Sequence, residues 1–125
     1  MIDHVSIAVR DLDKAAAFYD PVMRALDFAR LVTRENTVGY GKKYAEFWLN
    51  VRPAMAPVPA DGGCHVCLRT RTREQVDAFH RAAVAGGAAD DGRPGLRAEY
   101  SANYYAAFIR DPDGNRVEAV TFLEG

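Results

Sequence analysis

The sequence predicts an α+β domain made of two similar halves, each running strand, helix and then three strands. The first observation behind this prediction is an internal repeat: His4 and His65 lie 61 positions apart, and so do Phe18 and Phe79. The second is that each half passes from a strand-like run into an amphipathic helix and then into short strands bounded by turn residues. We therefore expect one domain with module 1 at about 1–55, a proline-rich linker at 52–63 and module 2 at about 63–125.

The first predicted helix follows a short apolar strand. Asp11 is a residue type that caps helix N-termini, and the apolar side chains after it repeat at helical spacing. Pro21 suits only the first turn of a helix, so we expect the helix to break or restart at Asp20-Pro21. The apolar stripe consists of Ala15, Phe18, Tyr19 and Val22.

The second predicted helix has clearer boundaries. Thr72 and Gln75 have the spacing of a capping box, in which each residue satisfies a backbone donor near the other. Val76, Phe79 and Ala83 follow at helical spacing, and the paired glycines at 86–87 predict the end of the helix.

Each half closes with further strands. Asp-Pro-Asp-Gly-Asn at 111–115 is a strong hairpin signal, because Asp-Gly tolerates a positive φ. The polar stretch 88–103 is expected to be a loop with a short strand near 96–100. The other predicted strands after the helices are 28–33, 36–40, 44–51, 104–110 and 116–122, with a turn at 41–43.

Composition excludes several classes of function. The formal net charge of −1 and the pI near 6.3 give no electrostatic basis for binding nucleic acid or an anionic membrane. No apolar run approaches the roughly 18–20 residues that a membrane span requires. We therefore expect a cytoplasmic protein that acts on a small molecule, with neither nucleic acid nor membrane as a partner.

The two cysteines, Cys64 and Cys67, form a C-x-x-C pair inside a strand-like run. Such a pair is found in redox motifs and in zinc sites. Because side chains alternate along a strand, these two point to opposite faces and do not share a metal or form an easy disulfide. We expect two small thiols that line the core.

Strand alternation also predicts which side chains share a face. In the first strand Val5, Ile7 and Val9 form the apolar face, so the intervening residues point the other way. The same reasoning in three further strands puts two histidines and two carboxylates on the face away from the helices. These are His4, His65, Glu46 and Glu118, with Ser6, Cys67, Trp48 and Asn50 beside them.

That face has two interpretations. It is the solvent side of any antiparallel sheet that carries helices on one side only, and a strand histidine there is often just a surface group. The alternative is a metal site, because two imidazoles and a carboxylate hold a divalent first-row metal and leave positions open for substrate or water. Alternation alone does not decide between them.

Five segments spread over nearly the whole chain match one family. They are D-H-V-S-I-A-V-x-D-L at 3–12, A-F-Y-D at 17–20, F-W-L at 47–49, G-x-H-V at 63–66, and Y-Y-A-A-F-I-R-D-P-D-G-N-R-V-E-A-V at 104–120. With them the sequence resembles the vicinal oxygen chelate superfamily, which includes glyoxalase I, fosfomycin-resistance proteins, extradiol dioxygenases and bleomycin-resistance proteins. The resemblance implies paired βαβββ modules whose curved mixed sheets form a metal cup, with one helix outside each module.

The resemblance also implies the metal ligands. His4 and His65 match the first-strand ligands of the two modules, and Glu118 matches the last-strand carboxylate. One divalent ion, Zn, Ni, Mn or Fe(II), is the expected cofactor. The fourth family position falls on Glu46 or on Trp48, which lie two residues apart on the same face. We favour Trp48, which leaves Glu46 near the rim as an acid/base candidate.

The function implied by the resemblance is a metal-dependent enzyme of the glyoxalase/dioxygenase type, with lyase or isomerase chemistry favoured. Its substrate would chelate the metal through two adjacent oxygens. The alternative is a protein of the bleomycin-resistance type that sequesters a drug or metabolite without turnover. Either function is expected in a homodimer, because family members commonly complete their cups with a second chain. The expected pocket residues are Trp48, Tyr100, Tyr104, Tyr105 and Arg97, with Arg93 as a second candidate for an anionic group.

Overall fold

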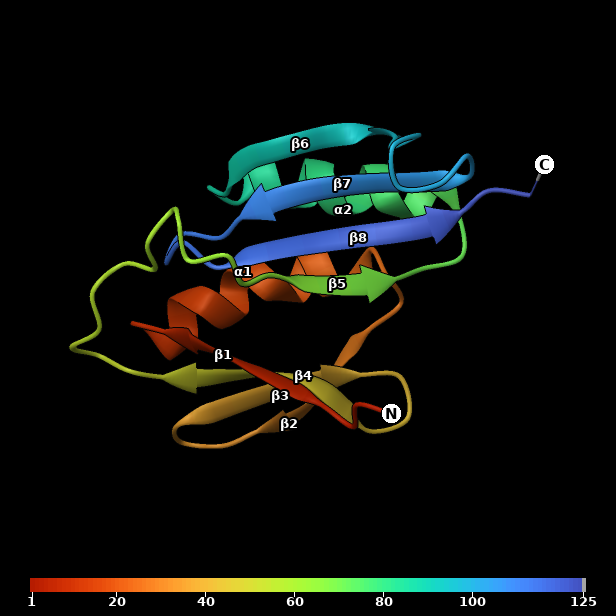
Figure 1. Ribbon diagram of the computed structural model, residues 1–125. Coiled ribbons are helices and arrows are strands. Elements are labelled where there is room, and N and C mark those ends of the chain that lie inside the picture. Colours follow the sequence, from red (N-terminus) through yellow and green to blue (C-terminus); the bar gives the residue numbers. More distant parts are fainter. Residues whose placement is uncertain (125) are drawn as a thin grey trace.

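The structure, a computed structural model, describes residues 1–124 (Figure 1). The first half contains one helix and four strands: β1 (Val5–Val9), α1 (Leu12–Arg24), β2 (Ala29–Thr33), β3 (Thr37–Gly41) and β4 (Ala45–Val51). The second half repeats this order: β5 (Val66–Arg69), α2 (Arg73–Ala85), β6 (Ala89–Leu96), β7 (Tyr104–Arg110) and β8 (Arg116–Phe122). Residues 52–65 link the halves and contain no helix or strand.

Each half forms its own four-stranded mixed sheet. The strand orders are β1-β4-β3-β2 and β5-β8-β7-β6. The first strand of each module pairs in parallel with the last, and the other pairs are antiparallel. The predicted α+β class and the duplicated βαβββ order are confirmed.

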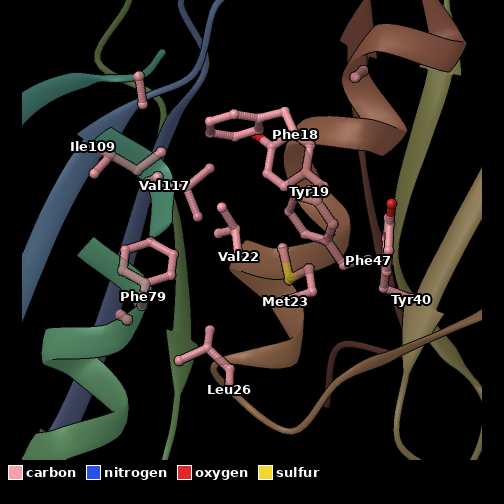
Figure 2. Close-up of a cluster of buried hydrophobic side chains, with 14 of the residues drawn as sticks. Phe18, Tyr19, Val22, Met23, Leu26, Tyr40, Phe47, Phe79, Ile109 and Val117 are labelled. Atoms are coloured by element: carbon pink, nitrogen blue, oxygen red, sulfur yellow. The ribbon is translucent and has the colours of Figure 1, made fainter. Parts of the chain in front are cut away.

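Both helices lie between the two sheets. Helix α1 contacts β2, β3 and β4, helix α2 contacts β6, β7 and β8, and the helices contact each other. Figure 2 shows side chains of both halves meeting there, with Val22 of α1 close to Phe79 of α2 and Val117 of β8. The helix-facing sides of both sheets therefore share one core, and the opposite sides lie on the outside of the chain.

Helix α1 begins as predicted but does not break at Pro21. Asp11 is its N-cap, and the carboxylate of Asp11 accepts a hydrogen bond from the Lys14 N–H. The helix continues through Pro21 to Arg24, so the predicted break is wrong. A proline inside a helix costs about 3 kcal/mol. Burying Val22 and Met23 completely contributes about 1.5–3 kcal/mol each, which is enough to offset that loss.

Helix α2 follows the predicted boundaries. The Thr72 hydroxyl accepts a hydrogen bond from the Gln75 N–H, and the Gln75 side chain accepts one from the Thr72 N–H, which completes the capping box. Gly86 is the C-cap, and Gly87 has φ = +104°, a conformation that L side chains rarely adopt. The sequence signals at both ends therefore correspond to real caps.

Strand β6 is a second place where the prediction of the fold is wrong. The sequence predicted a loop with a short strand near 96–100, whereas the strand occupies Ala89–Leu96. Its pairing with β7 shifts register between Asp90 and Gly92 and again between Gly92 and Gly95. These bulges interrupt the two-residue alternation by which strands are recognised. Pro94 is compatible with β6 because the strand lies at a sheet edge.

The turn between β7 and β8 joins the two halves. Asp111 is buried in it and accepts a hydrogen bond of 2.6 Å from the Tyr19 hydroxyl of α1. Asn115 donates from its side chain to the Ala8 carbonyl of β1 and to Asp111. Desolvation raises the pKa of Asp111, and desolvation and the charge of Asp111 raise the pKa of Tyr19. Within residues 1–124, neither helix has the length and apolar content needed to cross a membrane.

Candidate functional site

The outward faces of the two sheets carry the candidate residues in equivalent places. Across the parallel strand pairs, Ser6 of β1 is opposite Trp48 of β4, and Cys67 of β5 is opposite Glu118 of β8. Because side chains alternate along strands, the histidine two residues before Ser6 or Cys67 lies on the same face. The predicted alternation therefore agrees with the observed register.

The module 2 face gathers His65, Glu118 and Tyr104. His65 Nε2 and Glu118 Oε1 are 2.9 Å apart, and the Tyr104 hydroxyl donates a hydrogen bond to Glu118 Oε2. The Glu118 side chain is only 3% exposed, whereas that of His65 is 48% exposed. The Glu118 carboxylate is thus buried between the Tyr104 hydroxyl and the His65 imidazole, and the imidazole is the more exposed member of the His65–Glu118 pair.

Cys67 lies beside this cluster rather than in the core. Its sulfur is 3.9 Å from the Tyr104 hydroxyl, and both Cys64 and Cys67 are exposed, so the prediction of core-lining thiols is wrong. Desolvation of the thiolate and the charge of Glu118 raise the pKa of Cys67 to about 12. Desolvation and the hydrogen bond to Glu118 also raise the pKa of Tyr104. Both groups therefore stay protonated at neutral pH.

Aromatic rings surround the cluster. The Phe108 ring lies 6.4 Å from the His65 ring, and Phe108 pairs with Glu118 across β7 and β8. The rings of Tyr100 and Phe122 both meet the Tyr104 ring edge to face. Their centroids lie 5.1 Å and 5.4 Å from the Tyr104 centroid, respectively. The predicted pocket residues Tyr100 and Tyr104 therefore lie near Glu118.

Two residues of this face were missed from the sequence. Phe108 is four residues after Tyr104 on the same face of β7, and it pairs with Glu118 of β8. Applying strand alternation to residues 104–110, together with the pairing set by the hairpin at 111–115, would have identified it. Arg97 was predicted, and its guanidinium lies 5.3 Å from the centre of the Phe108 ring. Arg69, which was not predicted, lies 4.7 Å from the centre of the Phe122 ring.

Tyr105 does not belong to this surface. It points to the helix side of β7, where its hydroxyl donates a hydrogen bond of 2.6 Å to Asp77 of α2. The guanidinium of Arg73 covers its ring. The expectation that Tyr105 lines the pocket is therefore wrong, because neighbouring residues on a strand face opposite sides.

The module 1 face carries a separate hollow around His4. The His4 side chain is 54% exposed, and its Nδ1 is 2.8 Å from the Asp3 carboxylate. Trp48 forms one wall of the hollow, and the guanidinium of Arg34 lies 5.6 Å from the centre of the Trp48 ring. Ser6, Thr37 and Asn50 complete the lining.

Trp48 occupies the place in module 1 that Glu118 occupies in module 2. Trp48 pairs with Ser6, which is two residues after His4. In the same way, Glu118 pairs with Cys67, which is two residues after His65. Across the antiparallel neighbour, Trp48 pairs with Gly39 where Glu118 pairs with Phe108. Glu46 lies two residues before Trp48, on the same face and beyond the Val5–Phe47 pair.

One chain brings together two of the three expected metal ligands. Within residues 1–124 no three His, Cys, Asp or Glu side chains are grouped closely enough to hold a metal ion. His65 and Glu118 are adjacent, but His4 lies on the other sheet, whose outward face is separate because both helix-facing sides share the core. The described part of one chain therefore does not bring all three residues to one centre.

The pair that does form has suitable chemistry for a divalent cation. Imidazole nitrogen and carboxylate oxygen are common ligands of first-row metals, with bonds of about 2.0–2.2 Å. Two such atoms on one ion are about 3 Å apart, close to the 2.9 Å between His65 Nε2 and Glu118 Oε1. The Tyr104 hydroxyl holds the other carboxylate oxygen, which is the usual way in which a neighbouring group orients a metal ligand.

Comparison with known proteins agrees with this description. The family model described as Glyoxalase/Bleomycin resistance protein/Dioxygenase superfamily matches residues 1–119. A search of curated protein sequences gave no match. Among solved structures, a glyoxalase/bleomycin resistance protein from Albidiferax ferrireducens T118 is 29% identical, with a TM-score of 0.84 over 95% of this chain and 97% of that one.

Two more distant structures show the same fold. A glyoxalase/bleomycin resistance protein/dioxygenase family enzyme from Burkholderia phytofirmans PsJN is 20% identical, with a TM-score of 0.72 over 98% of both chains. A genomically encoded fosfomycin resistance protein from Listeria monocytogenes is 14% identical, with a TM-score of 0.69 over 98% of this chain and 93% of that one.

Proposed function

Because the chain belongs to the Glyoxalase/Bleomycin resistance protein/Dioxygenase superfamily, we propose that it is a metal-dependent enzyme acting on a small substrate with two adjacent oxygens. The proposed ligands of one divalent ion are His4, His65 and Glu118. The observation that carries the proposal is the 2.9 Å contact between His65 Nε2 and the buried Glu118 carboxylate on the outward face of module 2. A buried carboxylate beside an imidazole and a phenol is a suitable site for a cation.

We propose that the third ligand comes from a second copy of the chain. His4 precedes β1 and His65 precedes β5, and in the described sheets both strands lie at an edge with unpaired backbone groups. If β1 of one chain lies beside β5 of another, the two histidine faces join into one concave surface. The resulting homodimer would hold two equivalent centres.

The residues around the centre have distinct tasks in this proposal. When bound, the ion, which we expect to be Zn, Ni, Mn or Fe(II), acts as a Lewis acid on the substrate oxygens. Tyr104 donates a hydrogen bond to Glu118 and so holds the carboxylate in position for the ion. Glu46 remains the candidate for moving a proton, and Trp48, in the place equivalent to Glu118, forms a wall instead of a fourth ligand.

Metal titration tests the centre. We expect His4→Ala, His65→Ala and Glu118→Ala each to weaken binding of Mn, Ni or Zn by about 10–100-fold or more, measured by calorimetry and metal analysis. Glu46→Gln should bind metal as the wild type does. His80→Ala is the matched control, because this third histidine lies in α2 and contacts Asp90. Unchanged metal binding in a His4→Ala/His65→Ala double variant would exclude the site.

Mixing variants tests the shared site separately. His4→Ala and His65→Ala homodimers should each bind metal weakly. After subunit exchange, a mixed dimer regains one intact centre, so metal binding should return towards half of the wild-type stoichiometry in that species. A monomer at micromolar concentration by sedimentation, or no recovery after verified exchange, would contradict the two-chain centre. Turnover is then screened with 2-oxoaldehyde–thiol adducts, catechols and epoxides.

The second candidate function is sequestration of a drug or metabolite without turnover. It is favoured by the rings of Trp48, Tyr104 and Phe108 on the outward faces. Aromatic walls hold flat ligands without any metal. Purified protein with no stoichiometric metal and no gain in thermal stability from added Mn, Fe, Ni or Zn would favour this function.

A further inference from the structure

We propose that the site selects organic anions with an aromatic body. The inference rests on the proposed function for the location of the site, but it comes from a different set of side chains. These are Arg34, Arg69 and Arg97, whose guanidinium groups each lie over an aromatic ring on the outward faces.

Each arginine belongs to the surface that carries the proposed ligands. Arg69, at the end of β5, is four residues after His65 and therefore on the same face, and its guanidinium lies over the Phe122 ring. Arg97 lies over Phe108, the residue that pairs with Glu118. Arg34 lies over Trp48 and lines the His4 hollow.

The positive charges of these arginines are not neutralised within the chain. Among residues 1–124 none of the three has a carboxylate within 4.0 Å, whereas Arg10 and Arg30 have such a partner. Glu118 is the buried carboxylate of the module 2 face, and it is already engaged by His65 and Tyr104. These three guanidinium groups are therefore not paired with a carboxylate of the described residues.

The contact with a ring prepares the guanidinium groups for an anion. A guanidinium already placed over a ring loses less freedom on binding than a free side chain, and its fork of N–H groups fits a carboxylate. Arg97 is also fixed by hydrogen bonds to the carbonyls of Gly95 and Arg93, which use two of its five N–H groups. The others remain for a ligand.

The aromatic part of the proposed ligand follows from the rings that are still exposed. Tyr100 is 61% exposed and stands edge to face against Tyr104, next to Glu118. Trp48 provides a second flat wall in the module 1 hollow. Rings arranged in this way bind an aromatic or conjugated body better than an aliphatic chain.

The arginines could also serve only to cover apolar rings. Arg73 over Tyr105 is such a case, because it lies on the helix side, away from the proposed ligands. A covering role predicts that replacing the arginine lowers stability and changes the binding of charged and neutral ligands equally. A binding role predicts a loss confined to the anion, and this difference can be measured.

Three related probes separate charge from ring. Mandelate has an aromatic ring, a carboxylate and adjacent oxygens, methyl mandelate lacks the charge, and lactate lacks the ring. We expect calorimetry on the full chain to show that mandelate binds at least about tenfold more tightly than methyl mandelate, because a hydrogen bond to a charged group has about that effect. Mandelate should also bind about tenfold more tightly than lactate, because lactate keeps the carboxylate but lacks the ring that contacts the aromatic walls. Equal affinities for mandelate and lactate, or no binding of mandelate, would overturn the inference.

Arginine variants supply the second arm. Arg69→Gln and Arg97→Gln should each weaken mandelate binding about tenfold and leave methyl mandelate unchanged. The matched control is Arg81→Gln, on the exposed side of α2. Thermal unfolding of each variant reports any structural loss. If both ligands lose affinity equally, or if neither does, the arginines only cover the rings and the inference is wrong.

Failure of this inference can be distinguished from failure of the proposed function. Each titration is run on protein treated with EDTA and on protein loaded with Mn, and metal affinity is measured separately. Arginine-dependent binding of mandelate in protein that binds no metal would retain the anion site and reject the metal centre. Tight metal binding without arginine-dependent mandelate binding would retain the metal centre and reject the anion site.

Discussion

Trp48 lies directly over Gly39 of the neighbouring strand, and a Cβ at position 39 would come within 2.9 Å of its ring. The same Cβ would be 2.8 Å from the Ala45 Cβ. The restriction is one of space rather than of backbone conformation, because Gly39 does not have a positive φ. The indole that takes the place of a possible fourth ligand is thus positioned by the absence of a side chain opposite it.

Gly39→Ala is therefore expected to displace Trp48 and to lower the free energy of unfolding by about 1–3 kcal/mol, as overpacking usually does. Since Trp48 is the only tryptophan, its fluorescence reports the displacement without interference. Gly62→Ala, in the linker, is the control, since its closest contact would be 3.3 Å. Wild-type stability and an unchanged spectrum in Gly39→Ala would contradict this account.

Tyr104→Phe should weaken both the fold and the binding of metal. The buried Glu118 would lose a hydrogen bond to its charged group, which lowers the free energy of unfolding by about 1–3 kcal/mol. If Glu118 binds metal, loss of the group that orients it should reduce metal affinity about 10–100-fold. Tyr105→Phe is the matched control, because it removes a tyrosine–carboxylate bond on the helix side. Equal metal affinities in the two variants would show that Tyr104 has no orienting role.

The ion pair between Asp20 and Arg30 should make stability depend on pH at the acid end. Desolvation tends to raise the pKa of Asp20, but hydrogen bonds from Arg30 and Tyr40 outweigh it and lower the pKa. A carboxyl group with a lowered pKa in the folded state stabilises the fold above its unfolded value of about 3.9, and this contribution is lost as the pH falls through the folded value.

Asp20→Asn should accordingly lower Tm at pH values of about 5–7, and the difference from the wild type should shrink below about pH 4. Thermal unfolding followed by circular dichroism across this range measures the difference. Asp61→Asn, at an exposed linker position, serves as the control. A difference that stays constant down to about pH 2 would indicate that the charge of Asp20 has no part in it.

Cys67 should be a slow thiol despite its exposure. A pKa of about 12 leaves only about one thiolate in ten thousand at pH 8, and the thiolate is the reactive form. In a Cys64→Ala background, alkylation by iodoacetamide should therefore be much slower in the native protein than in urea. Glu118→Gln should speed the native reaction, because the charge of Glu118 contributes to the raised pKa. Equal rates in native and unfolded protein would refute this.

The sequence predicted local features better than the arrangement of the modules. Alternation placed His65 and Glu118 on one face because it depends only on strand geometry, and the register confirms it. The same alternation puts Tyr105, the residue after Tyr104, on the opposite face, where its hydroxyl contacts Asp77. It could not predict that His4 lies on a separate outward surface, because face assignment within a sheet does not determine how two sheets pack. The bulges in β6 removed the pattern that alternation needs.

The single core shared by the two modules has a consequence for the origin of the chain. Phe18 and Val22 of α1 and Phe79 of α2 are buried together with side chains of both sheets, so neither half encloses a complete core of its own. A half-length ancestor would have left that apolar helix face in water. If the two halves arose by duplication, such an ancestor would have had to associate with itself through its helices, and fusion would have converted a contact between copies into an internal one.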